Sequence, residues 1–131
     1  MPVITDFSLP TSAESLNLPT DSVFFISFHA SVDANTGKPW CPDVVAALPP
    51  LTAAFSVNDA PQVAFVEVGQ RPEWRDPSNV FRTKWNVNSV PTLARYERVD
   101  GKVKEVGRLV ESEILDQKKL KKLITRPLAQ L

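Results

Sequence analysis

Two stretches of the chain are almost continuously apolar and rich in β-branched and aromatic residues. They are residues 22–28 (Ser-Val-Phe-Phe-Ile-Ser-Phe) and residues 63–68 (Val-Ala-Phe-Val-Glu-Val). Runs of this kind are typical of strands that are covered on both faces of a sheet. Between them, apolar side chains recur at the spacing of one helical face, at Val44, Leu48, Leu51 and Phe55. The order strand, helix, strand predicts a parallel pair of strands joined by a right-handed crossover.

Two prolines fall inside this predicted helix. Pro49 and Pro50 directly follow Leu48. A proline has no amide hydrogen, and its ring collides with the carbonyl group four residues earlier in a helix. We therefore expect the helix to kink or break near Leu48.

Two further helices are predicted in the second half of the chain. Residues 76–78 (Asp-Pro-Ser) give a start signal with the Asp or the Ser as the cap, and a short helix from there runs to about Trp85. In residues 111–124 the acids come first and the lysines last, which matches the polarity of a helix dipole. This pattern predicts a terminal helix. Its basic end is interpreted as a solvated helix end rather than a polyanion site, and comprises Lys118, Lys119, Lys121 and Lys122.

A pair of adjacent strands precedes the terminal helix. Residues 92–98 and 102–109 flank Asp100-Gly101, a turn signal that favours an antiparallel hairpin. With the strands at 22–28 and 63–68, they predict a mixed sheet. Because two of these strands are apolar on both sides, we expect helices on both faces of the sheet. The predicted fold class is α/β, a three-layer sandwich.

Composition narrows the class of protein. The chain has 131 residues, 43% of them apolar, with 12 prolines and a single cysteine. A chain of this length buries about two-thirds of its unfolded surface, which suffices for one core and one domain, residues 1–131. The single cysteine excludes an intramolecular disulfide and a cysteine-rich zinc site. We expect no metal ion and no bound cofactor.

Charge is balanced overall but divided between the two halves. Residues 1–65 contain one base and six acids, and residues 66–131 contain fourteen bases and nine acids, giving net charges of −5 and +5. Halves of opposite sign can fold onto one another without a charged partner, so we do not expect nucleic-acid binding. No stretch approaches the roughly 18 apolar residues of a membrane span. The N-terminal segment has no basic start, so we expect a cytoplasmic protein with no membrane partner.

Cys41 stands between the first buried strand and the predicted helix, at or just before the helix N-terminus. Free backbone amides and the positive end of the helix dipole stabilise a thiolate there, and a thiolate is the nucleophile of disulfide exchange. Pro42 suits the first helical turn because it has no amide hydrogen to leave unpaired. The charge of Asp43 opposes thiolate formation, so the residues alone leave the net effect open. For His29, which ends the first strand, a structural or solvent-facing role is favoured over that of a base acting on Cys41.

Five ordered segments carry a resemblance to a known family. They are Gly37-Lys38-Pro39-Trp40-Cys41-Pro42-Asp43, Val68-Gly69, Trp74-Arg75-Asp76-Pro77, Val90-Pro91-Thr92-Leu93 and Val110-Glu111-Ser112. Over residues 7–124, the chain resembles the thioredoxin superfamily. It is most similar there to the cytosolic thioredoxin-related proteins of the Clot or thioredoxin-domain-containing group, whose active site reads Trp-Cys-Pro-Asp-Cys. The resemblance implies a single thioredoxin-like domain.

The resemblance also implies roles for individual residues. Cys41 is the implied attacking cysteine. The implied substrate-binding residues are Trp40, Pro42, Asp43, Val90 and Pro91. Pro91 is the implied cis-proline, and the backbone of Val90 before it is implied to pair with a bound substrate chain. We therefore expect a partly exposed Cys41 within about 5 Å of a cis Val90-Pro91 peptide.

The chain departs from the family at position 44. Where the family has its second, resolving cysteine, this sequence has Val44. A dithiol cycle is therefore closed, but Cys41 can still form a mixed disulfide that an external thiol resolves. The favoured hypothesis is a cytosolic monothiol thiol-disulfide oxidoreductase acting on disulfide-containing or glutathionylated proteins or on small disulfides, with glutathione as co-substrate. Two alternatives stay open: a redox-silent binding module that recognises an extended peptide beside Pro91, and a glutathione-transferase-like activity.

Overall fold

The computed structural model describes residues 3–128. Their strands form one five-stranded sheet of order β1-β3-β2-β4-β5. Its strands are β1 (Val3–Ile4), β2 (Val23–His29), β3 (Gln62–Glu67), β4 (Thr92–Val99) and β5 (Lys102–Val110). Its helices are α1 (Pro42–Phe55), α2 (Arg71–Arg75), α3 (Val80–Trp85) and α4 (Gln117–Thr125), with 3-10 turns η1 (Ala13–Ser15) and η2 (Glu111–Leu115). β1 and β2 each run parallel to β3, whereas β4 runs antiparallel to both β2 and β5. The predicted mixed sheet is confirmed.

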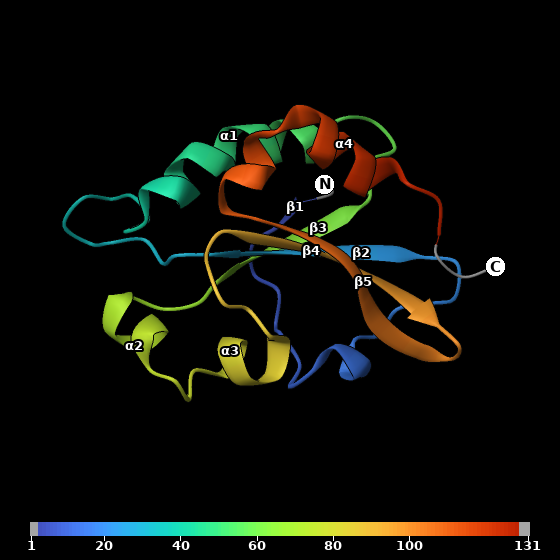
Figure 1. Cartoon of the computed structure of the whole chain (residues 1–131), viewed down its shortest axis with the longest axis horizontal. Helices are drawn as coiled ribbons and strands as arrows, with labels where there is room; N and C mark the ends of the chain where they lie inside the picture. The colour runs from blue at the N-terminus through green and yellow to red at the C-terminus, as the bar shows by residue number, and fades with distance from the viewer. Residues whose placement is uncertain (1–2, 129–131) are drawn as a thin grey trace.

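Helices cover both faces of this sheet, as predicted. Figure 1 shows α1 and α4 on one face and α2 and α3 on the other. On the α1 face, Phe25 of β2 packs with Leu51 and Phe55 of α1 in one apolar cluster. On the α3 face, Phe28 of β2 packs against Trp85, with ring centroids 6.1 Å apart. The three-layer α/β sandwich is therefore confirmed.

Each strand predicted from the sequence is present, with ends shifted by at most one residue. The hairpin turn is also as expected: Asp100 and Gly101 have φ values of 54° and 80°, the left-handed conformation that a tight hairpin turn requires. Strand β1 is an addition. Its two residues, Val3 and Ile4, pair with Val63 of β3 and its neighbour, and two residues are too few to produce a sequence pattern.

Helix α1 is continuous through both prolines, so of the kink or break expected near Leu48, the break does not occur. Pro49 and Pro50 cannot donate hydrogen bonds to the carbonyl groups of Val45 and Ala46, four residues earlier. Both of those residues are exposed on the outer face of the helix. Water can therefore bind the freed carbonyl groups, and the helix continues because its inner face stays buried against the sheet.

The short helix expected from Asp76 or Ser78 begins later than predicted. The N-cap of α3 is Asn79, whose side chain accepts a hydrogen bond from the backbone N–H of Phe81. Asp76 instead accepts hydrogen bonds from the backbone N–H and the hydroxyl of Ser78, which lower the pKa of Asp76. The cap prediction was wrong because Asp76 and Ser78 are hydrogen-bonded to each other in the turn before α3. Helix α2 was not predicted.

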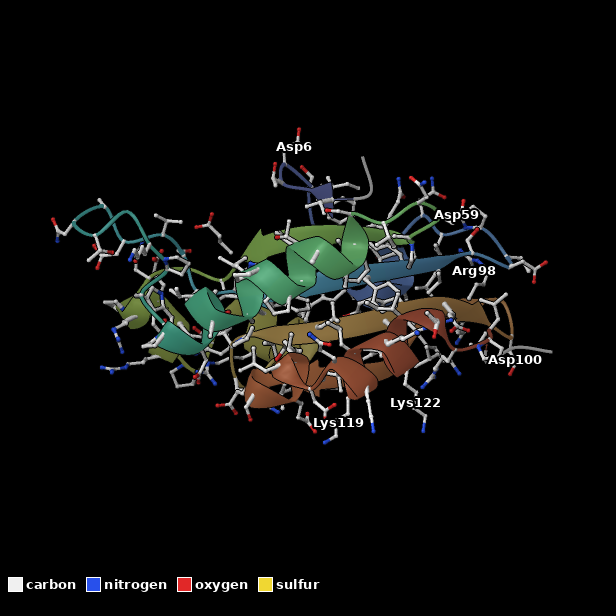
Figure 2. The ribbon with its side chains drawn as sticks, turned by 90° about the horizontal axis from the view of Figure 1, so that it is seen from above. Asp6, Asp59, Arg98, Asp100, Lys119 and Lys122 are labelled. Atoms are coloured by element: carbon white, nitrogen blue, oxygen red, sulfur yellow. The ribbon has the colours of Figure 1, made fainter. Side chains whose placement is uncertain are left out.

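The single terminal helix expected over residues 111–124 is divided at Asp116. The Asp116 side chain accepts hydrogen bonds from the backbone N–H groups of Lys118 and Lys119, so it caps a new helix, α4, after η2. The lysines of α4 are exposed. Figure 2 shows Lys119 and Lys122 projecting from α4 away from α1. This arrangement agrees with a solvated helix end.

Candidate functional site

Cys41 is the N-cap residue of α1. Its carbonyl oxygen accepts hydrogen bonds from the backbone N–H groups of Val44 and Val45, at 3.1 and 3.2 Å. Its side chain is half-buried. The thiol donates a hydrogen bond to the carbonyl oxygen of Val90, with Sγ 3.7 Å from that oxygen. A partly exposed thiol therefore lies at the start of α1, against the segment that precedes β4.

The Val90-Pro91 segment joins α3 to β4, and its peptide bond is cis. The Pro91 carbonyl accepts a hydrogen bond from the Glu111 N–H at 2.8 Å, and the Thr92 hydroxyl donates to the Ser89 carbonyl at 2.7 Å. These bonds hold the segment from both sides. Among residues 3–128, no hydrogen bond engages the Val90 N–H. The two motif halves, 49 residues apart in sequence, thus meet in space.

Trp40 is held between the segment before α1 and the segment after β3. Its indole Nε1 donates to the Gly69 carbonyl at 2.9 Å, and its backbone N–H donates to the Ser31 carbonyl at 3.3 Å. Arg71 contacts Trp40 twice: Nη2 donates to the Trp40 carbonyl at 3.0 Å, and the guanidinium carbon lies 4.9 Å from the centroid of the indole. The residue before the thiol is therefore positioned by α2.

The loop of residues 31–39 is joined to the end of β3 by further hydrogen bonds. The Val32 N–H donates to the carboxylate of Glu67 at 3.1 Å, and the Gln70 side-chain amide donates to the Val32 carbonyl at 2.8 Å. The Gly69 N–H donates to the hydroxyl of Ser31 at 2.9 Å. These contacts fix the base of the loop beside Trp40.

The remaining predicted site residues separate into exposed and buried ones. Pro42 and Asp43 face solvent beside Cys41. Val44, at the position of the family's second cysteine, has an exposed fraction of 0% and packs in the apolar core with Phe28 and Val90. The site surface therefore carries one sulfur, with a hydrocarbon side chain beneath it.

His29 is buried, so the solvent-facing alternative is wrong and the structural one holds. Its Nε2 lies 2.7 Å from the hydroxyl of Ser27, and its ring lies 4.8 Å from that of Phe65. Burial lowers the pKa of His29 from its usual 6.5 to about 4. The polar partner of this histidine is a serine and not Cys41.

Sequence reasoning missed Arg71, Gly69 and Ser31 as parts of this site. Gly69 belongs to the Val68-Gly69 segment already recognised as matching the family, and Arg71 follows it by two residues. A basic residue two positions after a matching segment was the available signal for Arg71. Nothing in the local pattern indicated that the Ser31 hydroxyl would reach Gly69.

Within residues 3–128, no group of three or more His, Cys, Asp or Glu side chains is placed to hold a metal ion. No helix in the same residues is long and apolar enough to cross a membrane.

Comparison with known proteins gives a family match over most of the chain. Residues 10–126 match the thioredoxin domain of the family described as thioredoxin domain-containing protein 17-like. A thioredoxin domain-containing protein of Schizosaccharomyces pombe is 40% identical over 109 residues, covering 82% of this chain and 87% of the relative. Human thioredoxin domain-containing protein 17 is 38% identical over 92 residues, covering 70% of this chain and 68% of that protein. The thioredoxin-like protein Clot of Arabidopsis thaliana is 34% identical over 76 residues, covering 56% of this chain and 57% of that protein.

Solved structures share the fold. Thioredoxin of Fasciola hepatica superposes with a TM-score of 0.53 at 22% identity, covering 83% of this chain and 84% of that chain. Thioredoxin O2 of Arabidopsis thaliana superposes with a TM-score of 0.54 at 17% identity, covering 95% of this chain and 96% of that chain. At these identities the likeness establishes a thioredoxin fold.

Proposed function

We propose that this chain is a monothiol thiol-disulfide oxidoreductase of the cytoplasm. The premise is that the chain belongs to the thioredoxin domain-containing protein 17-like family. The observation that carries the proposal is the site itself. A half-buried Cys41 thiol lies at the start of α1, while the position of a second cysteine holds the fully buried Val44. The sequence contains no other cysteine. Chemistry at this site therefore uses one protein sulfur.

The cycle consists of two thiol-disulfide exchanges. The Cys41 thiolate attacks the glutathionyl sulfur of a glutathionylated protein. A new S–S bond forms between Cys41 and glutathione, and the original S–S bond breaks and releases the protein thiolate. The thiolate of glutathione then attacks the mixed disulfide on Cys41. This second exchange releases the Cys41 thiolate and forms glutathione disulfide, so one free glutathione is consumed for each protein thiol released. With a small disulfide as substrate, Cys41 carries one half of it, the second exchange joins that half to glutathione, and a second glutathione reduces the resulting mixed disulfide.

Val90 supports recognition of a substrate chain at the site. Its N–H has no hydrogen-bond partner within residues 3–128, and its carbonyl oxygen lies 3.7 Å from Cys41 Sγ. An extended peptide that accepts from this N–H would place its own disulfide beside the thiol. The same free N–H favours the second candidate function, a binding module in which Cys41 takes no part in redox chemistry.

A turnover assay separates the two candidates. We expect the wild-type protein to reduce a glutathionylated peptide with glutathione as reductant. Glutathione reductase recycles the glutathione disulfide, and the accompanying oxidation of NADPH measures the rate. Cys41→Ser should lower the rate at least about a hundredfold, because the nucleophile is gone. We expect no turnover when thioredoxin reductase and NADPH replace glutathione, since that enzyme reduces an intramolecular disulfide and none can form here.

Two results would contradict the proposal. Substantial turnover of the wild type with thioredoxin reductase alone would exclude the monothiol cycle. Inactivity with every thiol tested, together with slow alkylation of Cys41 by iodoacetamide at neutral pH, would establish the binding module instead.

A further inference from the structure

Arg71 is a fixed cation beside the thiol that the cycle above does not use. Its Nη2 donates to the Trp40 carbonyl at 3.0 Å, and its guanidinium lies over the Trp40 ring at 4.9 Å. Stacking and a hydrogen bond together hold an otherwise flexible side chain in one orientation. The guanidinium nevertheless belongs to an exposed residue. Arg71 is thus positioned by its neighbours and open to solvent.

No carboxylate of residues 3–128 pairs with Arg71. A guanidinium has five N–H donors, and the hydrogen bond to Trp40 uses one of its nitrogens. The remaining donors form a planar fork that matches a carboxylate with two parallel hydrogen bonds. An oriented arginine without an acidic partner is therefore suited to an anionic group of a ligand.

The position of Arg71 relative to the sulfur limits the ligand's size. The Trp40 carbonyl belongs to the peptide bond that joins Trp40 to Cys41, and consecutive Cα atoms are about 3.8 Å apart. With a hydrogen bond of 3.0 Å from that carbonyl to Arg71, the guanidinium lies within the roughly 10 Å that an extended tripeptide spans. In glutathione the sulfur is on the central residue and each terminal residue carries a carboxylate, so a glutathionyl group bonded to Cys41 can place one of its carboxylates at Arg71.

The surface beside Arg71 and Trp40 is hollowed. Trp40, Gln70, Arg71 and Asp33 are among the residues that line a depression of about 400 Å³ beside the site. The Asp33 carboxylate accepts a hydrogen bond from the Asn35 N–H at 2.8 Å. Because glutathione carries one ammonium group as well as two carboxylates, an acid beside the arginine is compatible with this ligand.

We propose that Arg71, stacked on Trp40, binds a carboxylate of the glutathionyl group during both exchanges at Cys41. This inference rests on the proposed function, since it identifies the substrate class of the same site as thiols and disulfides that carry a carboxylate within about 10 Å of their sulfur. Arg71 acts in binding. The bonds to sulfur still form and break at Cys41.

A binding experiment tests the inference without requiring turnover. S-methylglutathione has no free thiol, so its dissociation constant, measured by NMR titration, is independent of redox chemistry. We expect Arg71→Gln to raise this constant about fivefold or more, the size of one charge-assisted hydrogen bond pair at a partly exposed site. Arg71→Lys should have an intermediate effect, because lysine keeps the charge but loses the planar fork.

Two controls isolate the carboxylate contact. Arg75→Gln removes the same charge from the same helix, at a residue that makes no hydrogen bond or cation–π contact with Trp40 within residues 3–128. It should change the constant less than about twofold. S-methylglutathione diethyl ester has the ligand's shape without its negative charges. It should bind wild type as weakly as the acid binds Arg71→Gln.

Three outcomes would overturn the inference: no measurable binding to wild type, equal binding by wild type and Arg71→Gln, or equal binding of the acid and the ester. Failure of the proposed function looks different. In that case S-methylglutathione still binds through Arg71, but the wild type shows no glutathione-dependent turnover. If the second outcome came with a loss of turnover in Arg71→Gln, Arg71 would act on Cys41 itself and not on the ligand's carboxylate.

Discussion

His29 is a titratable side chain buried in the sheet at the end of β2. Its only polar contact in the described residues is the hydroxyl of Ser27, 2.7 Å from Nε2. An imidazolium in this position would lose its hydration without gaining an anionic partner, and burial accordingly lowers the pKa of His29 to about 4. The neutral ring is therefore the form that the folded protein accommodates.

This burial predicts a loss of stability in mild acid. Between the unfolded pKa of 6.5 and the folded pKa of about 4, His29 is protonated mainly in the unfolded state, which favours unfolding. The stability that His29 contributes is complete above pH 6.5 and falls progressively as the pH drops to about 4. We expect a difference of up to about 3 kcal/mol in the free energy of unfolding across this range, at about 1.4 kcal/mol per pH unit.

His29→Gln provides the control, because glutamine keeps a polar group for Ser27 but does not titrate. Urea unfolding at pH 7.5, 6, 5 and 4 measures both proteins. As the pH falls, the free energy of unfolding should decrease more for the wild type than for the variant. Titratable groups that both proteins share contribute equally and cancel in the difference. Parallel pH profiles would contradict the prediction.

At the scale of elements, the sequence pattern predicted β2, β3 and α1 because each has a long apolar signal, and it predicted β4 and β5 because Asp100-Gly101 marks the turn between them. Residues 22–28 and 63–68 are covered on both faces, so tertiary packing reinforces their local pattern. Apart from the break expected at Pro49 and Pro50, the errors in helix boundaries occurred where a single polar side chain decides where a helix begins. Asn79 and Asp116 each cap a helix through their own side-chain oxygen, and several Asp, Asn and Ser residues nearby offered the same signal.

The candidate site likewise has one part that could be predicted from the sequence and one part that could not. The position of Cys41 followed from its place before a helix, and its meeting with Val90 followed from the resemblance. The contacts of Arg71 and Gly69 with Trp40 did not follow from either source, because they join two loops whose relative position depends on the packing of α2. Long-range loop contacts of this kind leave no periodic signal in the sequence.

Helix α1 supplies a direct test of the single-sulfur assignment. Val44 and Cys41 lie one turn apart, and the Val44 N–H donates to the Cys41 carbonyl at 3.1 Å. Val44→Cys therefore creates a buried second thiol next to the first. We expect thioredoxin reductase and NADPH to reduce a small disulfide through this variant at least about tenfold faster than through wild type, because an intramolecular disulfide can now form.

Val44→Ala is the matched control for this variant. Both substitutions shorten a fully buried side chain, so each should cost about 1 to 2 kcal/mol of stability, but only one adds a thiol. An equal gain in both variants, or none in Val44→Cys, would contradict the prediction. Coupled NADPH oxidation at matched folded fractions is the measurement.

At the scale of the whole molecule, the two oppositely charged halves are interleaved in one sheet. β2 from the first half lies between β3 and β4, and α4 from the end of the chain packs beside α1 (Figure 1). The last helix is tied to the sheet by Arg95 of β4. Its guanidinium, 2% exposed, donates to the carbonyl groups of Leu123 at 2.8 Å and Arg126 at 2.9 Å and forms an ion pair with Glu97 at 2.7 Å.

This buried arginine satisfies carbonyl groups at the C-terminal end of α4, where a helix leaves its acceptors unpaired and a cation is favourable. Removing it breaks a buried ion pair and several hydrogen bonds at once. We expect Arg95→Met to lower the free energy of unfolding by about 3 kcal/mol or more. Urea unfolding followed by tryptophan fluorescence and far-ultraviolet circular dichroism is the measurement.

The double variant Arg95→Met, Glu97→Met distinguishes ion pairing from packing. If the cost of the single variant comes largely from the carboxylate that loses its arginine, the double variant should regain part of the lost stability, because both buried charges are then absent. Alkylation of Cys41 in the folded single variant should proceed at the wild-type rate, since Arg95 acts on α4 and not on the thiol. A single variant within about 0.5 kcal/mol of wild type would show that α4 is held by its apolar face alone.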